Sequence, residues 1–115
     1  MSNNIIFESA TELAEQIKTK KISSLELTQA YIDQIEKHDE KINAVPVRRF
    51  EQALREAKEA DEDLAKGELR GPLHGVPMTI KESYVMKDTP STWGDIAHKD
   101  NFSDKDGLIV SRFKS

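Results

Sequence analysis

One lysine of this 115-residue chain stands where a basic side chain could take part in chemistry. Lys81 directly follows the short β-capable run Met78-Thr79-Ile80, which a Gly-Val-Pro step precedes. By the two-residue period of a strand, Lys81 opposes Ile80, so it could be carried into an interior at a strand end. Burial disfavours the charged ammonium form, which is how a lysine becomes a usable base near neutral pH. The plainer alternative is a solvated lysine that marks the end of a strand.

Other polar residues near this lysine are weaker candidates. Glu82 and Ser83 offer an acid and a hydroxyl, but adjacent residues on a strand face opposite sides. Ser83 could share the face of Lys81, yet a nucleophile needs its base and an orienting partner within reach. His74, a lone histidine between Leu73 and Gly75, is more typical of a structural role. The residue types and their spacing alone therefore leave both interpretations of Lys81 open.

A longer pattern surrounds this lysine. The segment 71–83, GPLHGVPMTIKES, is followed by PSTWG at 90–94, and together they closely resemble the amino-terminal half of the amidase signature hydrolases. The resemblance extends more loosely over nearly the whole chain. That family uses a Ser-Ser-Lys triad, so the resemblance implies that Lys81 is the catalytic lysine. It also implies cleavage of the C–N bond of a small-molecule carboxamide, or of an ester, through an acyl-enzyme, with no metal or organic cofactor.

The same resemblance implies parts that this sequence does not contain. The family's nucleophilic and bridging serines belong to a Gly-Ser-Ser-rich segment far downstream, and no such run occurs here. This chain would supply Lys81 and, around Trp93, part of the wall of the site. We therefore expect the isolated chain to be inactive. Trp93 is also expected to anchor the core.

Three functional hypotheses follow. The first is the amino-terminal part of an amidase whose carboxyl-terminal portion is missing. The second is a fragment of a glutamyl-tRNA amidotransferase A-type subunit, which frees ammonia from glutamine and works with partner subunits. The third is a non-catalytic binding or scaffold remnant. We favour the first. A copurifying partner would indicate the second, and a locus that does not continue into a Gly-Ser-Ser-rich segment would indicate the third.

Composition excludes several classes of function. The chain has 17 Lys and Arg against 21 Asp and Glu, a net charge of −4, so nucleic acid is not an expected direct partner. It has no cysteine, which excludes a disulfide framework, thiol catalysis and a thiolate metal site. No apolar run is long enough to cross a bilayer, and the first residues do not resemble an export signal. We expect a cytoplasmic protein with no membrane partner.

Helical elements are predicted in the first two thirds of the chain. Ser9 with Glu12, and Ser23 with Glu26, each have the capping-box spacing, which predicts two successive helices. A third helix is predicted over 49–66, with an alanine-rich inner face and a charged outer face that we interpret as solvated.

Strands and one more helix are predicted around these. The segments 42–47 and 78–80 indicate short strands, and a helix is expected to begin near Asp104, weakened by Gly107 in its interior. The predicted fold class is α/β: amino-terminal helices, then part of a mixed β-sheet covered by helices, an incomplete amidase signature fold. Residues 1–115 form the front of one domain, with 1–40 as a helical lead-in and 41–115 as the start of the α/β core. A sheet cut off in this way would leave apolar faces uncovered, so self-association is expected.

Overall fold

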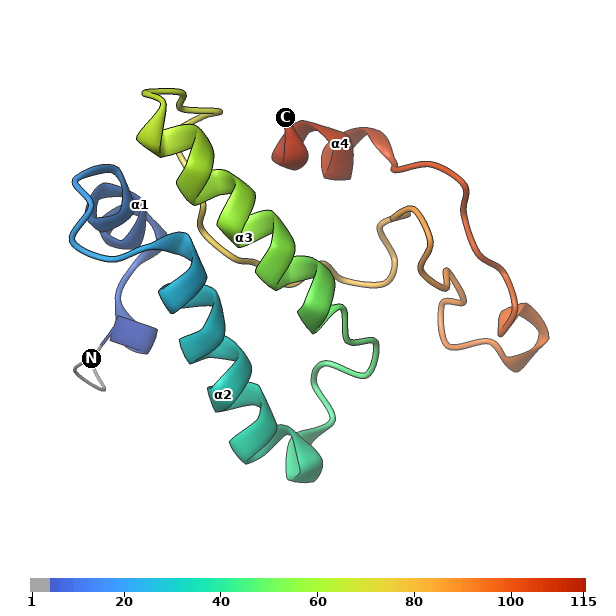
Figure 1. Cartoon of the computed structure of the whole chain (residues 1–115). Coiled ribbons are helices and arrows are strands. Elements are labelled where there is room, and N and C mark those ends of the chain that lie inside the picture. Colours follow the sequence, from blue (N-terminus) through green and yellow to red (C-terminus); the bar gives the residue numbers. More distant parts are fainter. Residues whose placement is uncertain (1–4) are drawn as a thin grey trace. The chain divides into compact units, whose positions relative to one another are not determined.

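The computed structural model describes residues 5–115, which form two compact units that divide between Pro77 and Met78. The first unit contains three α-helices and the second contains one short α-helix (Figure 1). In chain order the elements are the 3-10 helix η1 (Ile5–Phe7), α1 (Ala10–Lys18), α2 (Ser24–Ile42), α3 (Phe50–Ala65), the 3-10 helix η2 (Ile96–His98) and α4 (Leu108–Lys114).

Both predicted capping boxes are present and begin α1 and α2. The Glu12 carboxylate accepts the Ser9 backbone N–H at 2.9 Å, while Ser9 Oγ accepts the Glu12 N–H at 3.3 Å. Ser23 and Glu26 make the same reciprocal pair at 2.9 and 3.0 Å. The backbone N–H groups of Ser9 and Ser23 lower the pKa of both glutamates, because they stabilise the ionised carboxylates. These boxes pair amides that a helix start leaves without partners, and the two predicted helices are confirmed.

The strand predicted from Ile42 is wrong, because α2 continues through Ile42. The helix ends at Asn43, whose φ of 51° is left-handed, a conformation that stops helices and that asparagine tolerates. Asp39 then accepts the backbone N–H groups of Ala44 and Val45 at 2.7 and 3.1 Å. The chain therefore turns at this point and does not extend into a strand.

The core of the first unit lies between its helices. In Figure 1, α2 and α3 lie side by side and run in opposite directions. The predicted inner face of α3 is buried at Ala57, Ala60 and Leu64, so its alanine face packs on another helix. Ile22, which is suited to pack as a staple on Leu27, is buried in the same cluster. The buried core residues are Ile5, Leu13, Ile17, Ile22, Leu27 and Leu64.

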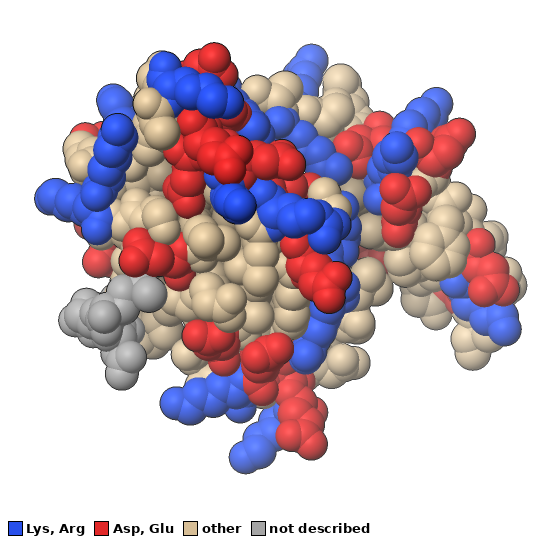
Figure 2. Space-filling model, in the orientation of Figure 1, with Lys and Arg blue, Asp and Glu red and all other residues tan. Residues whose placement is uncertain are grey.

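The outer face of α3 is charged, as predicted, and Figure 2 shows acidic and basic side chains interspersed on the visible face. One acidic residue of this helix, Asp61, makes hydrogen bonds to another helix. The Asp61 carboxylate accepts the backbone N–H of Ser24 at 2.7 Å and of Leu25 at 3.0 Å. A side chain of α3 thus pairs the first amides of α2, which fixes one helix against the other.

The glycine-rich loop after α3 closes on the start of α2. Ser24 Oγ donates to the Gly75 carbonyl oxygen at 2.5 Å. Gly75 has a φ of +77°, and a Cβ built on it would lie 3.1 Å from Ser24 Cβ and 3.3 Å from Ile17 Cγ2. Only glycine fits this backbone conformation and this spacing without strain. Val76, the next residue, packs against the core cluster.

Backbone β pairing in the second unit, residues 78–115, is limited to two short contacts. In residues 5–115 the only β pairs are two isolated bridges, Lys87 with Ser103 and Pro90 with Phe102. The predicted strand at 78–80 is therefore not formed, and the predicted mixed sheet is not present among residues 5–115. A strand needs a neighbouring strand for its backbone groups, and none of the described segments pairs with 78–80.

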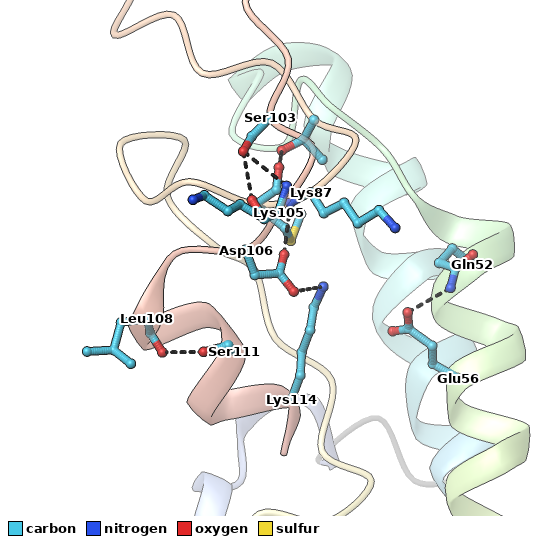
Figure 3. A network of polar contacts seen from close by, with 11 residues as sticks. Gln52, Glu56, Lys87, Ser103, Lys105, Asp106, Leu108, Ser111 and Lys114 are labelled. Atoms are coloured by element: carbon cyan, nitrogen blue, oxygen red, sulfur yellow. Dashed lines mark hydrogen bonds and ion pairs between the residues drawn. The ribbon is translucent and has the colours of Figure 1, made fainter.

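Figure 3 shows Asp106 between two parts of the second unit. Its carboxylate accepts the Lys87 backbone N–H at 2.8 Å and the Lys114 amine at 2.9 Å. The next residue, Gly107, precedes α4 and donates its N–H to the Val85 carbonyl at 2.8 Å. The predicted helix near Asp104 is thus present, but Gly107 lies before its first turn, so the expected penalty of an interior glycine does not arise.

Apolar side chains of the second unit are mostly exposed. Val110 is its one buried hydrophobic residue among those described, and nine large hydrophobic residues remain exposed. Across residues 5–115, no helix has both the length and the apolar character that a membrane span requires. The exposed residues are Met78, Tyr84, Val85, Trp93, Ile96, Phe102, Leu108, Ile109 and Phe113.

Candidate functional site

The predicted catalytic lysine lies near the start of the second unit. Lys81 is exposed, and its carbonyl accepts the Tyr84 N–H at 2.9 Å, so the chain turns directly after it. The expectation that Lys81 is carried into an interior at a strand end is therefore wrong for this chain. The physical reason is the absence of the strand itself: without a sheet among residues 5–115, no layer of backbone encloses the side chain.

Glu82, the next residue, connects this region to a later loop. Its carboxylate accepts the backbone N–H groups of both Thr92 and Trp93, the second at 3.1 Å. The Thr92 N–H is the main cause of a lowered Glu82 pKa, and the Trp93 N–H adds to it, while partial burial acts in the opposite direction. The ionised carboxylate therefore holds the end of the lysine segment against the later loop.

The loop that Glu82 holds has an unusual backbone. Trp93 has a φ of 54° and Gly94 a φ of 76°, so two successive residues lie in the left-handed region. A non-glycine residue rarely adopts this conformation unless its surroundings maintain it. Trp93 is 76% exposed, so the prediction that it anchors the core is wrong for this chain. Its backbone is fixed while its indole ring faces solvent.

A second connection keeps the same loop in place. The buried Ser91 donates its N–H to the Asn101 carbonyl at 2.8 Å, and the Asn101 side-chain amide donates to the Ser91 carbonyl at 2.9 Å. The Thr92 hydroxyl accepts the Gly94 N–H at 3.2 Å. The loop 91–94 is thus bonded on one side to Glu82 and on the other to Asn101.

The lone histidine of the glycine-rich loop has a structural position, as expected. His74 is buried, its Nε2 lies 2.8 Å from the Ala60 carbonyl oxygen, and its Nδ1 accepts the Arg70 N–H at 3.1 Å. Since Nδ1 is an acceptor, these partners assign the ring proton to Nε2. Both ring nitrogens are occupied within the first unit, which argues against acid–base chemistry at His74.

No metal site forms in the part of the chain that the structure describes, because no three His, Asp or Glu side chains gather there. Two surface hollows lie elsewhere. One is lined by α1, the start of α2 and the end of α3, and the other by Ile109, Arg112 and Phe113 on α4. Lys81 lines neither hollow. The candidate site in this chain is therefore the hydrogen-bonded backbone around 81–94 with the exposed amine of Lys81.

Glu82 is the residue whose role the sequence did not indicate. In the sequence it is only an acid beside Lys81, and the alternation of a strand would place it on the opposite face. A signal was available in the Thr-Trp-Gly run at 92–94, since a turn near glycine leaves backbone amides that a nearby carboxylate can pair. Sequence separation hid the pairing, because Glu82 lies 10 and 11 residues from its two partners.

Comparison with known proteins gives a consistent result. The family model described as Amidase matches residues 26–115, which include Lys81, Glu82 and the loop 91–94. The chain is 35% identical over 123 residues to fatty-acid amide hydrolase 2-A of Danio rerio, covering 99% of this chain and 23% of that protein. It is 39% identical over 103 residues to the A-type subunit of the glutamyl-tRNA(Gln) amidotransferase of Geobacter sp. (strain M21), covering 90% and 21%.

A solved structure agrees with these sequence matches. The chain superimposes on a bacterial aryl acylamidase of the amidase signature family with a TM-score of 0.77 and 36% identity, over 84% of this chain and 20% of that one. The chain thus spans about a fifth to a quarter of the length of the relatives it matches. Since the family model covers most of the sequence, from the start of α2 to the last residue, the chain belongs to the amidase signature family.

Proposed function

We propose that this chain is the amino-terminal part of an amidase-signature hydrolase and that Lys81 is its catalytic base. The observation that carries the proposal is the family match over 26–115, which contains the whole segment 71–94 and Lys81 within it. The fold supports it, because this chain superimposes on part of a solved aryl acylamidase.

In the proposed reaction, the Lys81 amine accepts a proton from a bridging serine. That serine in turn takes the proton of the nucleophilic serine, which attacks the amide carbonyl carbon. Backbone N–H groups stabilise the oxyanion, the C–N bond breaks, and the amine leaves with the proton that the Lys81 ammonium returns through the bridging serine. Water then releases the acid from the acyl-enzyme. Of these groups, this chain supplies Lys81, and the loop 91–94 would form part of the wall around it.

The exposure of Lys81 is compatible with this role in a longer protein. The chain covers only 20–23% of the relatives it matches, so most of the layers that would enclose the amine are not among its residues. A lysine acts as a base when surrounding protein excludes water from its amine. We therefore place the enclosing surface, like both serines, in the remainder of the family domain.

A chimera tests the proposal. This chain would replace the matching segment of the bacterial aryl acylamidase, and release of the amine product from an aryl amide would be measured. Lys81→Met should reduce kcat by about 100-fold or more, the range typical of a lost general base. Lys99→Met removes another exposed lysine of the second unit and should leave the rate unchanged. An active chimera that tolerates Lys81→Met would contradict the assignment.

The isolated chain should release no ammonia from simple amides, since it lacks the Gly-Ser-Ser-rich segment to which the two serines of the triad belong. Purified chain would be incubated with a simple carboxamide and ammonia would be measured. Turnover that disappears in the Lys81→Ala variant would contradict the expectation that the reaction needs the missing serines. Turnover that persists in that variant would point to a contaminating hydrolase.

A second candidate is a piece of an amidotransferase subunit. The 39% identity to the Geobacter glutamyl-tRNA(Gln) amidotransferase favours it. Such a protein would pass ammonia from glutamine to an acceptor and would need partner subunits. Copurification of tagged chain from its native cell, followed by mass spectrometry, separates the two candidates: recovered amidotransferase subunits support this one, and their absence supports the hydrolase.

A further inference from the structure

Glu82 joins two parts of the second unit that are distant in sequence. Its carboxylate accepts the backbone N–H groups of Thr92 and Trp93, while its own backbone continues directly from Lys81. A carboxylate that bonds two successive amides is restricted in both position and direction, because each of its oxygens must stay in line with its own N–H group.

The partners of Glu82 are themselves fixed. Trp93 and Gly94 hold left-handed backbone conformations, and Ser91 is bonded in both directions to Asn101. Without the carboxylate, the N–H groups of Thr92 and Trp93 would lose their acceptors, and the left-handed Trp93 would lose a contact that maintains it. The loop therefore holds the Glu82 carboxylate in one position, and this also restricts the backbone of Lys81, the preceding residue.

We propose that Glu82 is a positioning residue, which fixes the backbone of Lys81 relative to the loop 91–94 through the Thr92 and Trp93 amides. The proposal rests on the proposed role of Lys81 as base. A base on a flexible side chain works best from a fixed backbone, because the amine must return to the same hydroxyl at each turnover. The exposed lysine gains this constraint from its neighbour, since no buried layer among the described residues supplies it.

The Glu82 carboxylate has other groups near it in the chain that matter for a titration. In the sequence, the charged residues flanking these segments are Lys81, directly before Glu82, and Asp95, directly after Gly94, while Thr92 and Trp93 face the carboxylate with neutral amides. Because the carboxylate is stabilised when ionised, protonation should release both N–H groups together. The lowered pKa of Glu82 places this transition below the ordinary glutamate value of about 4.3.

The experiment uses the full chain labelled with 15N. The amide signals of Thr92 and Trp93 would be followed from neutral to acid pH, and the sole tryptophan makes Trp93 fluorescence a second probe. Both amides and the fluorescence should change with one shared midpoint below about 4.3. Glu82→Gln should abolish that transition, and Lys81→Met should retain it, which separates failure of this inference from failure of the proposed function.

A second measurement at neutral pH reports on the lysine itself. In Glu82→Gln, hydrogen exchange of the Thr92 and Trp93 amides should accelerate by about tenfold or more. The Lys81 backbone amide should lose order on the nanosecond timescale, while the helical signal of the first unit stays unchanged. The matched control Asp88→Asn alters an exposed acid of the same unit and should show neither effect.

Two results would overturn the proposal. One is an acid titration of the parent chain in which the Thr92 and Trp93 amides do not respond together. This test uses the parent chain alone, so it does not depend on the folding of any variant. The other is a Glu82→Gln chain whose Lys81 order and loop exchange equal those of the parent.

Discussion

Ser24 and Gly75 are 51 residues apart in the chain, yet the Ser24 hydroxyl donates to the Gly75 carbonyl oxygen at 2.5 Å. This bond joins the first turn of α2 to the glycine-rich loop that leads toward Lys81. Since a Cβ on Gly75 would meet Ser24 and Ile17, the loop can approach the helix this closely only because the residue is glycine.

Gly75→Ala should destabilise the first unit by about 2 kcal/mol, from a strained left-handed φ and a crowded methyl group. Gly71→Ala is the matched control in the same loop, because a Cβ at Gly71 meets nothing within 4 Å. Urea unfolding followed by far-ultraviolet circular dichroism would measure both. Equal stability of the two variants would contradict the close approach.

Asp61→Ala should lower stability by about 1–2 kcal/mol, since the backbone N–H groups of Ser24 and Leu25 would lose their acceptor. Glu59→Ala, on the exposed face of the same helix, should change stability little. The same urea titrations would check the difference. If Asp61 only meets solvent, the two variants should behave alike.

Asp39 should make stability depend on acid pH. Burial acts to raise its pKa, but bonds from the Ala44 and Val45 amides and from Arg48 outweigh it, and the net pKa is lowered. Its contribution is therefore fully present above the unfolded value of about 3.9 and is lost as pH falls through the lower folded value.

Urea midpoints measured from pH 6 to pH 2.5, roughly spanning the range in which aspartates titrate, would show this loss. Asp39→Asn should be less stable at neutral pH and should flatten the acid dependence. Glu36→Gln, on α2 and without the amide partners of Asp39, is the control that should keep the slope of the parent. An unchanged slope in Asp39→Asn would show that other carboxylates dominate.

The second unit should self-associate through its exposed apolar side chains, because large uncovered patches favour association. Ile109→Asp and Phe113→Asp, which change a groove on α4, should weaken association by about tenfold in sedimentation velocity. Phe7→Asp changes an 82% exposed residue of the first unit and should have no effect. A monomeric parent at all concentrations tested would contradict the prediction.

Local patterns in the sequence were sufficient for the helices. Two capping boxes predicted α1 and α2, and the alanine face over 49–66 predicted α3, since caps and helical periodicity depend on near neighbours. The family resemblance, carried by 71–94, is confirmed by the family match. The catalytic role of Lys81 and the division at residue 40 stay predictions.

Tertiary structure decided strand formation and burial, which neighbouring residues in the sequence do not determine. Whether 78–80 becomes a strand depends on a pairing partner, and residues 5–115 provide none, so Lys81 is exposed and Trp93 does not anchor a core. Asp61 and Glu82 accept backbone N–H groups that lie 37 and 10 residues away in the sequence. The sequence by itself thus determined the helices and the family, whereas the contacts of the lysine segment required the folded chain, because hydrogen bonds between distant segments are set by packing.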